Sequence, residues 1–411
     1  ALGNQALKDN TTGTQNVAVG SNSLDANTTA SNNTGVGYAA LGANTTGTRN
    51  IAIGAESLDA SVGINDNIAI GYQAQTANTG NGATANTGAS NIAIGSYALK
   101  SLNSTSSGDS IQNVAIGHEA MESATSAYRC VAIGYRALEL NQTTNTTVAV
   151  GWYSLREMTT GANNTGLGHY TLTRTTTGAS NTAVGYAALE YNTTGDYNTA
   201  VGDQSLDQLT TADNNTAVGY RSLYLNTTGA NNTAVGALAL DANQTGEKLT
   251  AVGSNALGAN TADQNTAVGY YALSNNTTGT TNTAIGVQAM HQTTTSSRGT
   301  AVGHFALDNT NSGDRNTAVG FQALTSNTTG EYNTAVGDAA LEANTTGNYN
   351  CAVGQAALGA NTTGANNTAV GYLALDANTT GNYNVAVGDY SLSLIHISAP
   401  TRRRRIADAV V

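Results

Sequence analysis

Acidic side chains are the most regularly placed of the residues in this sequence that could do chemistry. They recur five residues after a glycine that closes an Ala-Val-Gly-like triplet, which we call the anchor glycine. The members of this acidic row are Asp25, Asp59, Glu122, Glu139, Glu190, Asp207, Asp241, Asp308, Glu342 and Asp376. Calcium needs several oxygens converging on each ion, and GGxGxD calcium turns are missing. We therefore expect a solvated row that discourages edge-to-edge aggregation, and no metal site.

The histidines and cysteines show no pattern typical of a site. His118, His169 and His304 directly follow an anchor glycine, where other repeats place an aromatic residue, and we interpret them as surface rings. Cys130 and Cys351 would lie many coils apart in a linear array, too far to bridge, so we expect two small buried residues. No GxSxG, HExxH or P-loop pattern occurs. The sequence predicts no catalytic, cofactor-binding or metal-ligating residues, no cofactor and no enzyme.

Composition favours a repeat protein over a disordered chain. The 411 residues carry a net charge of −11, only 10% charged residues and a single proline, and Val, Ile and Leu recur at regular places. Disordered chains are usually richer in charge and proline. An acidic chain disfavours nucleic-acid binding, which needs a basic stripe. No stretch is apolar enough to span a membrane.

The anchor glycines define the period. Nineteen of their 22 intervals are 17 residues long, and the exceptions are 24, 22 and 16. The two long intervals hold inserts at 76–90 and 101–112, which we expect to be loops and the best candidates for ligand contact. The anchors are residues 3, 20, 37, 54, 71, 95, 117, 134, 151, 168, 185, 202, 219, 236, 253, 269, 286, 303, 320, 337, 354, 371 and 388.

Seventeen residues is too short for a helix-turn-helix repeat, and β-branched residues with Gly and Asn turns are typical of strands. We predict an all-β parallel solenoid of about 23 coils over residues 1–392, each with two short strands and two turns. The recurring NTTG is read as a turn. The Asn four before each anchor should form an amide ladder. The Leu four after it should form the core, with the Val or Ile before the anchor beside it.

The strand before the anchor is apolar or small on both faces. Positions one and three before the anchor share one face, and the anchor and the Ala or Gly two before it share the other. A strand like this is usually covered on both faces, yet the solenoid interior covers only one. We expect the other face to pack against copies of the same chain in a homo-oligomer. The alternative is a monomeric solenoid in which one face of small residues stays uncovered.

Five segments carry the same short motif: NVAVG (16–20), NIAIG (67–71 and 91–95), NVAIG (113–117) and CVAIG (130–134). This motif resembles the SVAIG core of YadA-like head repeats. These repeats belong to trimeric autotransporter adhesins, and similar ones occur in phage tail fibres. The resemblance covers essentially residues 1–392. It implies a left-handed β-roll, a homotrimer, and exposure at the bacterial outer-membrane surface or on a virion. The 17-residue coil is longer than the usual coil of that family, with NTTG as the extra turn.

The end of the chain departs from the repeat. Residues 393–411 contain the only proline and the run Arg402 to Arg405. The string LIHISAPTR resembles a translated sequencing-adapter read-through, often seen in metagenomic reading frames, so we interpret this tail as a sequencing or assembly artefact. The alternative is a basic tail that binds anionic partners.

Taken together, these patterns predict a non-enzymatic, surface-exposed structural and adhesive module. It would be the head or shaft of a trimeric adhesin that attaches to a host-surface or extracellular-matrix ligand. The alternative is a phage tail-fibre shaft. An ice-binding solenoid is less favoured, because the paired Thr lie adjacent in a turn. A solenoid polysaccharide-processing enzyme is also less favoured, since it needs clustered acidic and basic residues that uniform repeats do not supply.

Overall fold

The computed structural model describes residues 1–77, 90–102, 111–143 and 145–393, and the chain forms two units, residues 1–213 and 214–411. Most of the predicted loop inserts at 76–90 and 101–112 lies outside the described residues. So does the predicted tail, from residue 394 onward. Each unit is described by itself.

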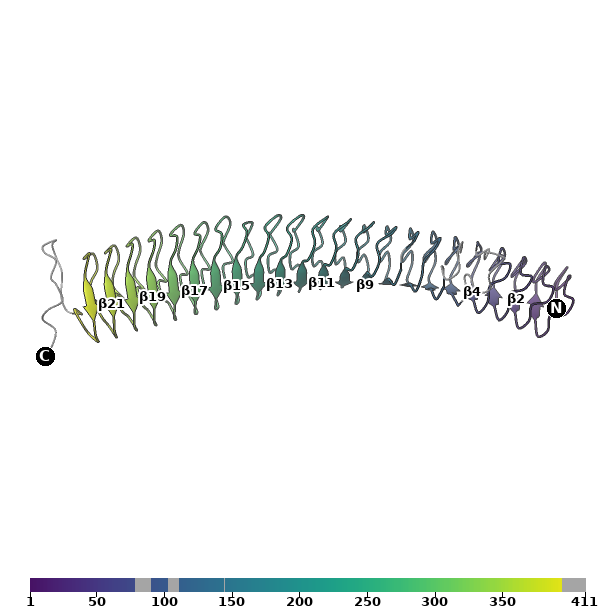
Figure 1. The fold of residues 1–411 in the computed structure, drawn as a ribbon, viewed down its shortest axis with the longest axis horizontal. Coiled ribbons are helices and arrows are strands. Elements are labelled where there is room, and N and C mark those ends of the chain that lie inside the picture. The colour runs from purple at the N-terminus through teal and green to yellow at the C-terminus, as the bar shows by residue number, and fades with distance from the viewer. Residues whose placement is uncertain (78–89, 103–110, 144, 394–411) are drawn as a thin grey trace. The chain divides into compact units, whose positions relative to one another are not determined.

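Each unit is a parallel β-solenoid of eleven three-residue strands, and every strand pairs in register with the next strand of its unit (Figure 1). Among the described residues there is no helix of the length and apolar character needed to cross a membrane. The strands of unit 1 are β1 (Val17–Val19), β2 (Thr34–Val36), β3 (Ile51–Ile53), β4 (Ile68–Ile70), β5 (Ile92–Ile94), β6 (Val114–Ile116), β7 (Val131–Ile133), β8 (Val148–Val150), β9 (Thr165–Leu167), β10 (Thr182–Val184) and β11 (Thr199–Val201). Those of unit 2 are β12 (Thr216–Val218), β13 (Thr233–Val235), β14 (Thr250–Val252), β15 (Thr266–Val268), β16 (Thr283–Ile285), β17 (Thr300–Val302), β18 (Thr317–Val319), β19 (Thr334–Val336), β20 (Cys351–Val353), β21 (Thr368–Val370) and β22 (Val385–Val387).

The predicted solenoid is confirmed, but the prediction of two strands per coil is wrong. Each coil has one strand, and the first repeat contributes only the bridge Leu2↔Val19. Left-handed backbone breaks up the rest of the coil, for example at Ala39 (φ 51°) and Leu41 (φ 54°). Coils still bond to one another there, since the Leu41 N–H donates to the carbonyl of Ser57 at 3.0 Å. The left-handed conformation costs about 1–2 kcal/mol per residue, and complete burial of the leucine offsets it.

The anchor position requires glycine for two independent reasons. At Gly337 φ is +140°, a conformation that residues with a Cβ rarely adopt. A Cβ built there would also lie 2.5 Å from the carbonyl oxygen of Gly354, the anchor of the next coil. The anchors therefore stack backbone on backbone, which explains why this position is glycine in every repeat.

Alanine and leucine fill the interior of each coil. The Leu four after the anchor is fully buried, as at Leu58 and Leu341, so the predicted leucine core is confirmed. The Ala two before the anchor is also fully buried, as at Ala52 and Ala335. The prediction that the Val or Ile before the anchor lies in the core is wrong, because Ile53 is 40% exposed. The strand face that points inward is the small one, since the leucine side chains occupy the remaining interior.

The predicted amide ladder of the Asn four before the anchor is confirmed. The Asn50 N–H donates to Asn33 Oδ1 at 2.9 Å, and the Asn50 side-chain amide donates to the carbonyl of Ile64 at 2.8 Å. Asn50 Oδ1 in turn accepts from the Asn67 N–H at 3.1 Å. Each buried amide thus bonds to both neighbouring coils, which satisfies polar groups that would otherwise be costly to bury.

The NTTG segment makes a second ladder that the sequence analysis missed. Asn344 Nδ2 donates to Asn327 Oδ1 at 2.8 Å and to the carbonyl of Gly347 at 3.1 Å. The hydroxyl of Thr345 donates to the carbonyl of Thr362 at 3.0 Å. The segment turns the chain, as predicted, and its side chains also bond to neighbouring coils.

Candidate interaction surfaces

The outward side of the strands is an unusual solvent-exposed surface, which we call the strand face. It consists of the first and third residues of every strand, while the middle residue points into the coil. Third-position side chains such as Ile133 and Val336 are each 37% exposed although coils lie on both sides of them. The third residue of every strand is Val, Ile or Leu, so the atoms that remain exposed form a continuous apolar row along each unit.

The strand face differs in composition between the units. In unit 1, seven of the eleven strands begin with Val or Ile, whereas in unit 2 nine of the eleven begin with Thr. Unit 1 is therefore apolar in both outward rows over seven of its strands, and unit 2 pairs a mostly hydroxyl row with an apolar row. Cys351 begins β20 in the outward row and is partly exposed, so the prediction that it is buried is wrong. Cys130 is buried, as predicted, in the position of a ladder Asn.

The acidic row is half-buried, and the prediction that it is solvated is wrong. Its side chains come after the buried leucine, where the chain still lies against the next coil. Burial is the largest cause that raises the pKa of Asp59, Glu139, Glu190, Asp241 and Asp308. Asp308 Oδ1 and Asp376 Oδ1 are buried without a hydrogen-bond donor. These carboxylates are costly to bury as anions.

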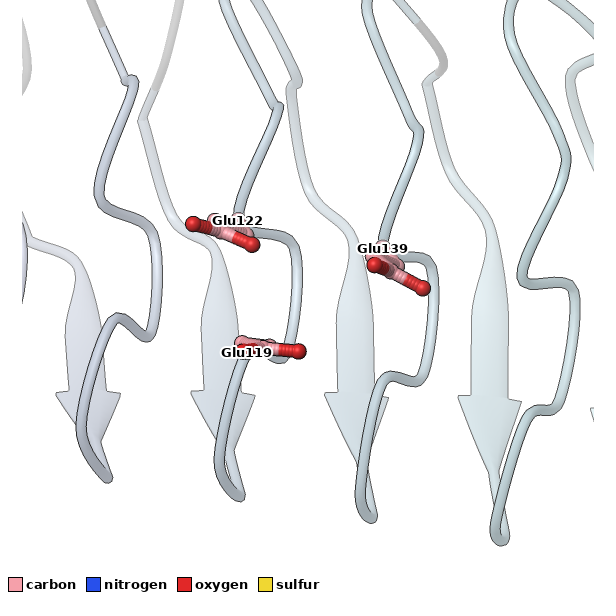
Figure 2. Close-up of side chains that lie close together, drawn as sticks. All are labelled: Glu119, Glu122 and Glu139. Atoms are coloured by element: carbon pink, nitrogen blue, oxygen red, sulfur yellow. The ribbon is translucent and has the colours of Figure 1, made fainter.

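Two members of the row, Glu122 and Glu139, come together with Glu119, which the sequence analysis did not single out. Figure 2 shows Glu119 and Glu122 on one coil and Glu139 on the next, and one oxygen of each lies within 4.8 Å of the others. Parallel stacking in register explains the juxtaposition. Within the described residues, this is the one group of three or more His, Cys, Asp or Glu side chains close enough to share a metal ion.

Two arginines already supply positive charge to this group. Arg136 Nε donates to Glu119 and lies 3.7 Å from Glu139 Oε1. Arg156 Nε lies 3.6 Å from Glu139 Oε2, and its Nη2 donates to Glu157 at 3.0 Å. A cation would have to displace these guanidinium groups, so the cluster is better described as an ion-pair network. Its existence corrects the expectation that uniform repeats bring no acidic and basic residues together.

Aromatic rings form a second continuous feature of unit 1, which we call the aromatic strip. Its rings follow the anchor glycine by one or two residues in seven successive coils, those of residues 71, 95, 117, 134, 151, 168 and 185. Each ring contacts another ring of the strip, with centroids 5.3–6.5 Å apart. The members are Tyr72, Tyr97, His118, Tyr135, Trp152, Tyr153, His169, Tyr170 and Tyr186.

Among the described residues no histidine is a member of a group close enough to share a metal ion, although His118 Nδ1 lies 3.5 Å from Glu119 Oε1. His118 and His169 belong to the aromatic strip. His304 stacks on Phe305 with centroids 3.9 Å apart, and His291 Nδ1 lies 2.7 Å from the hydroxyl of Ser274. Their interpretation as rings without a metal role stays a prediction.

Comparison with known proteins finds no protein-family model and no curated protein that matches this chain. The candidate surfaces therefore have to be interpreted from their own geometry and chemistry.

Proposed function

We propose that this chain is a non-enzymatic structural and adhesive module that self-associates through its strand face, in the manner of the head or shaft of a trimeric adhesin. The observation that supports the proposal is the continuous apolar row on the outward side of every strand. A protein surface that is apolar over many coils is covered in the functional state or aggregates. Identical rows on identical chains can cover one another by closed symmetry.

The rest of the molecule is consistent with a structural role. Interior positions are devoted to coil stacking through the anchor glycines, the leucine core and the two Asn ladders. A homotrimer at a bacterial outer-membrane surface or on a virion follows from the resemblance to YadA-like repeats and is part of the proposal. The shaft of a phage tail fibre would use the same strand face in the same way, so it remains the alternative setting.

Sedimentation of the full chain at micromolar concentration tests the proposal. We expect the mass of three chains for the parent protein. Ile133→Lys places a charge in the apolar row of unit 1 and should shift the mass toward one chain, because burying an unpaired ammonium in the interface is costly. Val336→Lys, in the Thr-containing face of unit 2, should have a smaller effect.

Leu140→Lys is the matched control, because Leu140 is a similarly exposed apolar residue, 39% exposed, that lies outside the strands. It should leave the mass unchanged. A parent protein that sediments as a folded single chain would overturn the proposal.

Ice binding is the second candidate, and the threonine row of unit 2 favours it. Unlike the paired Thr of the turns, Thr233, Thr250 and Thr266 stand in register on neighbouring strands of a parallel sheet. This regular hydroxyl row beside a Val row is the kind of array that ice binding requires. Thermal hysteresis from a monomeric chain would favour this function over self-association.

A further inference from the structure

We infer that the aromatic strip of unit 1 is a binding surface for a neutral linear glycan. The inference deepens the adhesive part of the proposed function and rests on it. It starts from a contrast in exposure within the strip. The rings one residue after the anchor are open to solvent, with Tyr72 42%, Trp152 44% and Tyr186 51% exposed. The rings two residues after it, such as Tyr97 and Tyr153, are half-buried.

The half-buried rings hold the exposed rings in place. Trp152 stacks on Tyr153 with centroids 5.3 Å apart, and Tyr135 meets Tyr153 edge to face at 5.5 Å. Aromatic pairs of this geometry stabilise one another beyond the effect of their burial alone. The exposed rings are therefore preorganised, which lowers the conformational cost of binding a ligand.

Charged groups run beside the rings and are nearly balanced in sign. Each of three cations lies over a tyrosine ring of the strip. The distance from the charged group to the ring centroid is 4.7 Å for Lys100 over Tyr97, 5.2 Å for Arg136 over Tyr135 and 5.1 Å for Arg156 over Tyr153. Their carboxylate partners are Glu119, Glu122, Glu139 and Glu157. Around these three rings, three cations against four anions create little net field, so this part of the surface favours neither a polyanion nor a polycation.

This combination fits the chemistry of a sugar. The C–H face of a pyranose packs against an aromatic ring, and its hydroxyl groups both donate to carboxylates and accept from guanidinium groups. The strip also repeats once per coil, about 4.8 Å along the stack, so the matching ligand is itself a linear repeating chain. Nucleic acid, the other polymer that stacks on rows of rings, needs a positively charged groove that this balanced surface does not offer.

The single tryptophan of the chain, Trp152, lies within the strip and serves as a built-in reporter. The experiment titrates the full chain with two soluble neutral polysaccharides, a galactomannan and a mixed-linkage β-glucan, and with alginate as the anionic comparator. We expect the Trp152 emission to change with at least one neutral glycan and not with alginate. Tyr135→Ala should weaken the affinity for that glycan roughly tenfold, as expected for the loss of one ring contact.

Tyr38→Ala is the matched control. Tyr38 occupies the same position after an anchor glycine and is 54% exposed, but the neighbouring coils carry Ser21 and Ala55 there instead of rings. This variant should bind like the parent. Sedimentation of each variant separates the proposal of self-association from the proposal of glycan binding. The sedimenting mass measures self-association, whereas the emission of Trp152 measures glycan binding at the aromatic strip.

Four outcomes would overturn the inference. Three are no response to either neutral glycan, a response to alginate as strong as to the neutral glycans, and a Tyr135→Ala variant that binds like the parent. The fourth is binding of serum albumin, titrated in the same way, without binding of glycans, which would indicate a nonspecific apolar surface. A Tyr135→Ala variant with reduced mass and no glycan response in the parent would assign the strip to self-association.

Discussion

Units 1 and 2 share an interior and differ in their surfaces. In both, buried Ala and Leu alternate with Asn ladders, and the anchor glycines stack in the same conformation. On the outside, unit 1 carries Val or Ile at both outward positions of most of its strands, an aromatic strip and an ion-pair network. Unit 2 carries a Thr row and a Val row instead. The interior has to satisfy one stacking geometry in every coil, whereas the surface is free to specialise.

The first prediction concerns the shared interior and has the largest expected effect on stability. Asn50→Ala in unit 1 and Asn333→Ala in unit 2 remove equivalent ladder bonds, the donations of Asn50 Nδ2 to the carbonyl of Ile64 and of Asn333 Nδ2 to the carbonyl of Gly347, both at 2.8 Å. We expect each to lower the local opening free energy by about 2–3 kcal/mol, because buried donors and acceptors lose their partners. Hydrogen exchange of peptides from the altered coil measures this, since repeat proteins open locally.

Gln142→Ala and Gln244→Ala are the controls for the ladder variants, since both amides are exposed. They should leave exchange unchanged. If only one of the two variants, Asn50→Ala or Asn333→Ala, lowered the local opening free energy, the interiors of the two units would not be equivalent.

The second prediction concerns the acidic row of unit 2. Burial raises the pKa of Asp308, while His291 and His304 lower it by a smaller amount. The folded state therefore binds a proton more tightly than the unfolded state, and stability increases as the pH falls from about 7 toward the unfolded pKa near 4. Asp308→Asn should increase stability at neutral pH by less than about 1 kcal/mol, because His291 and His304 offset part of the cost of burying this carboxylate.

Exchange of the Asp308 coil, followed against pH, tests this prediction. The parent should become more protected on acidification, and Asp308→Asn should show a weaker pH dependence. Protection of this coil that decreases steadily with acidification in the parent would contradict the assigned sign.

The third and smallest prediction concerns the ion-pair network of unit 1. Arg136→Met removes a guanidinium that pairs with Glu119 and Glu139. We expect a small loss of protection in these coils at low salt that becomes smaller at high salt, because mobile ions screen partly exposed charges. Arg315→Met in unit 2 is the matched control, since Arg315 lies over the Tyr332 ring at 4.9 Å. A salt-independent loss at Arg136 would indicate packing by its aliphatic chain rather than charge.

Particular residues show how far the sequence could lead. The 17-residue period places like residues on like residues, so the ladder of Asn33 and Asn50 and the core row of Leu41 and Leu58 were predictable. The second ladder was also present in the sequence as the Asn of NTTG, yet the turn propensity of that segment hid its bonds between coils. The Glu119 cluster could have been found by comparing positions 17 residues apart, which brings Glu122 beside Glu139.

The sequence by itself determined the period, the parallel stacking and the leucine core, because an in-register repeat leaves no other way to bury those side chains. Only the tertiary structure decided which strand face points inward. Ala52 and Ile53 are both apolar, so the alternation carries no polar marker, and side-chain volume makes the choice: alanine fits beside the leucine row and isoleucine does not. Left-handed residues such as Ala39, and the burial of Asp308, likewise depend on how tightly one coil lies against the next.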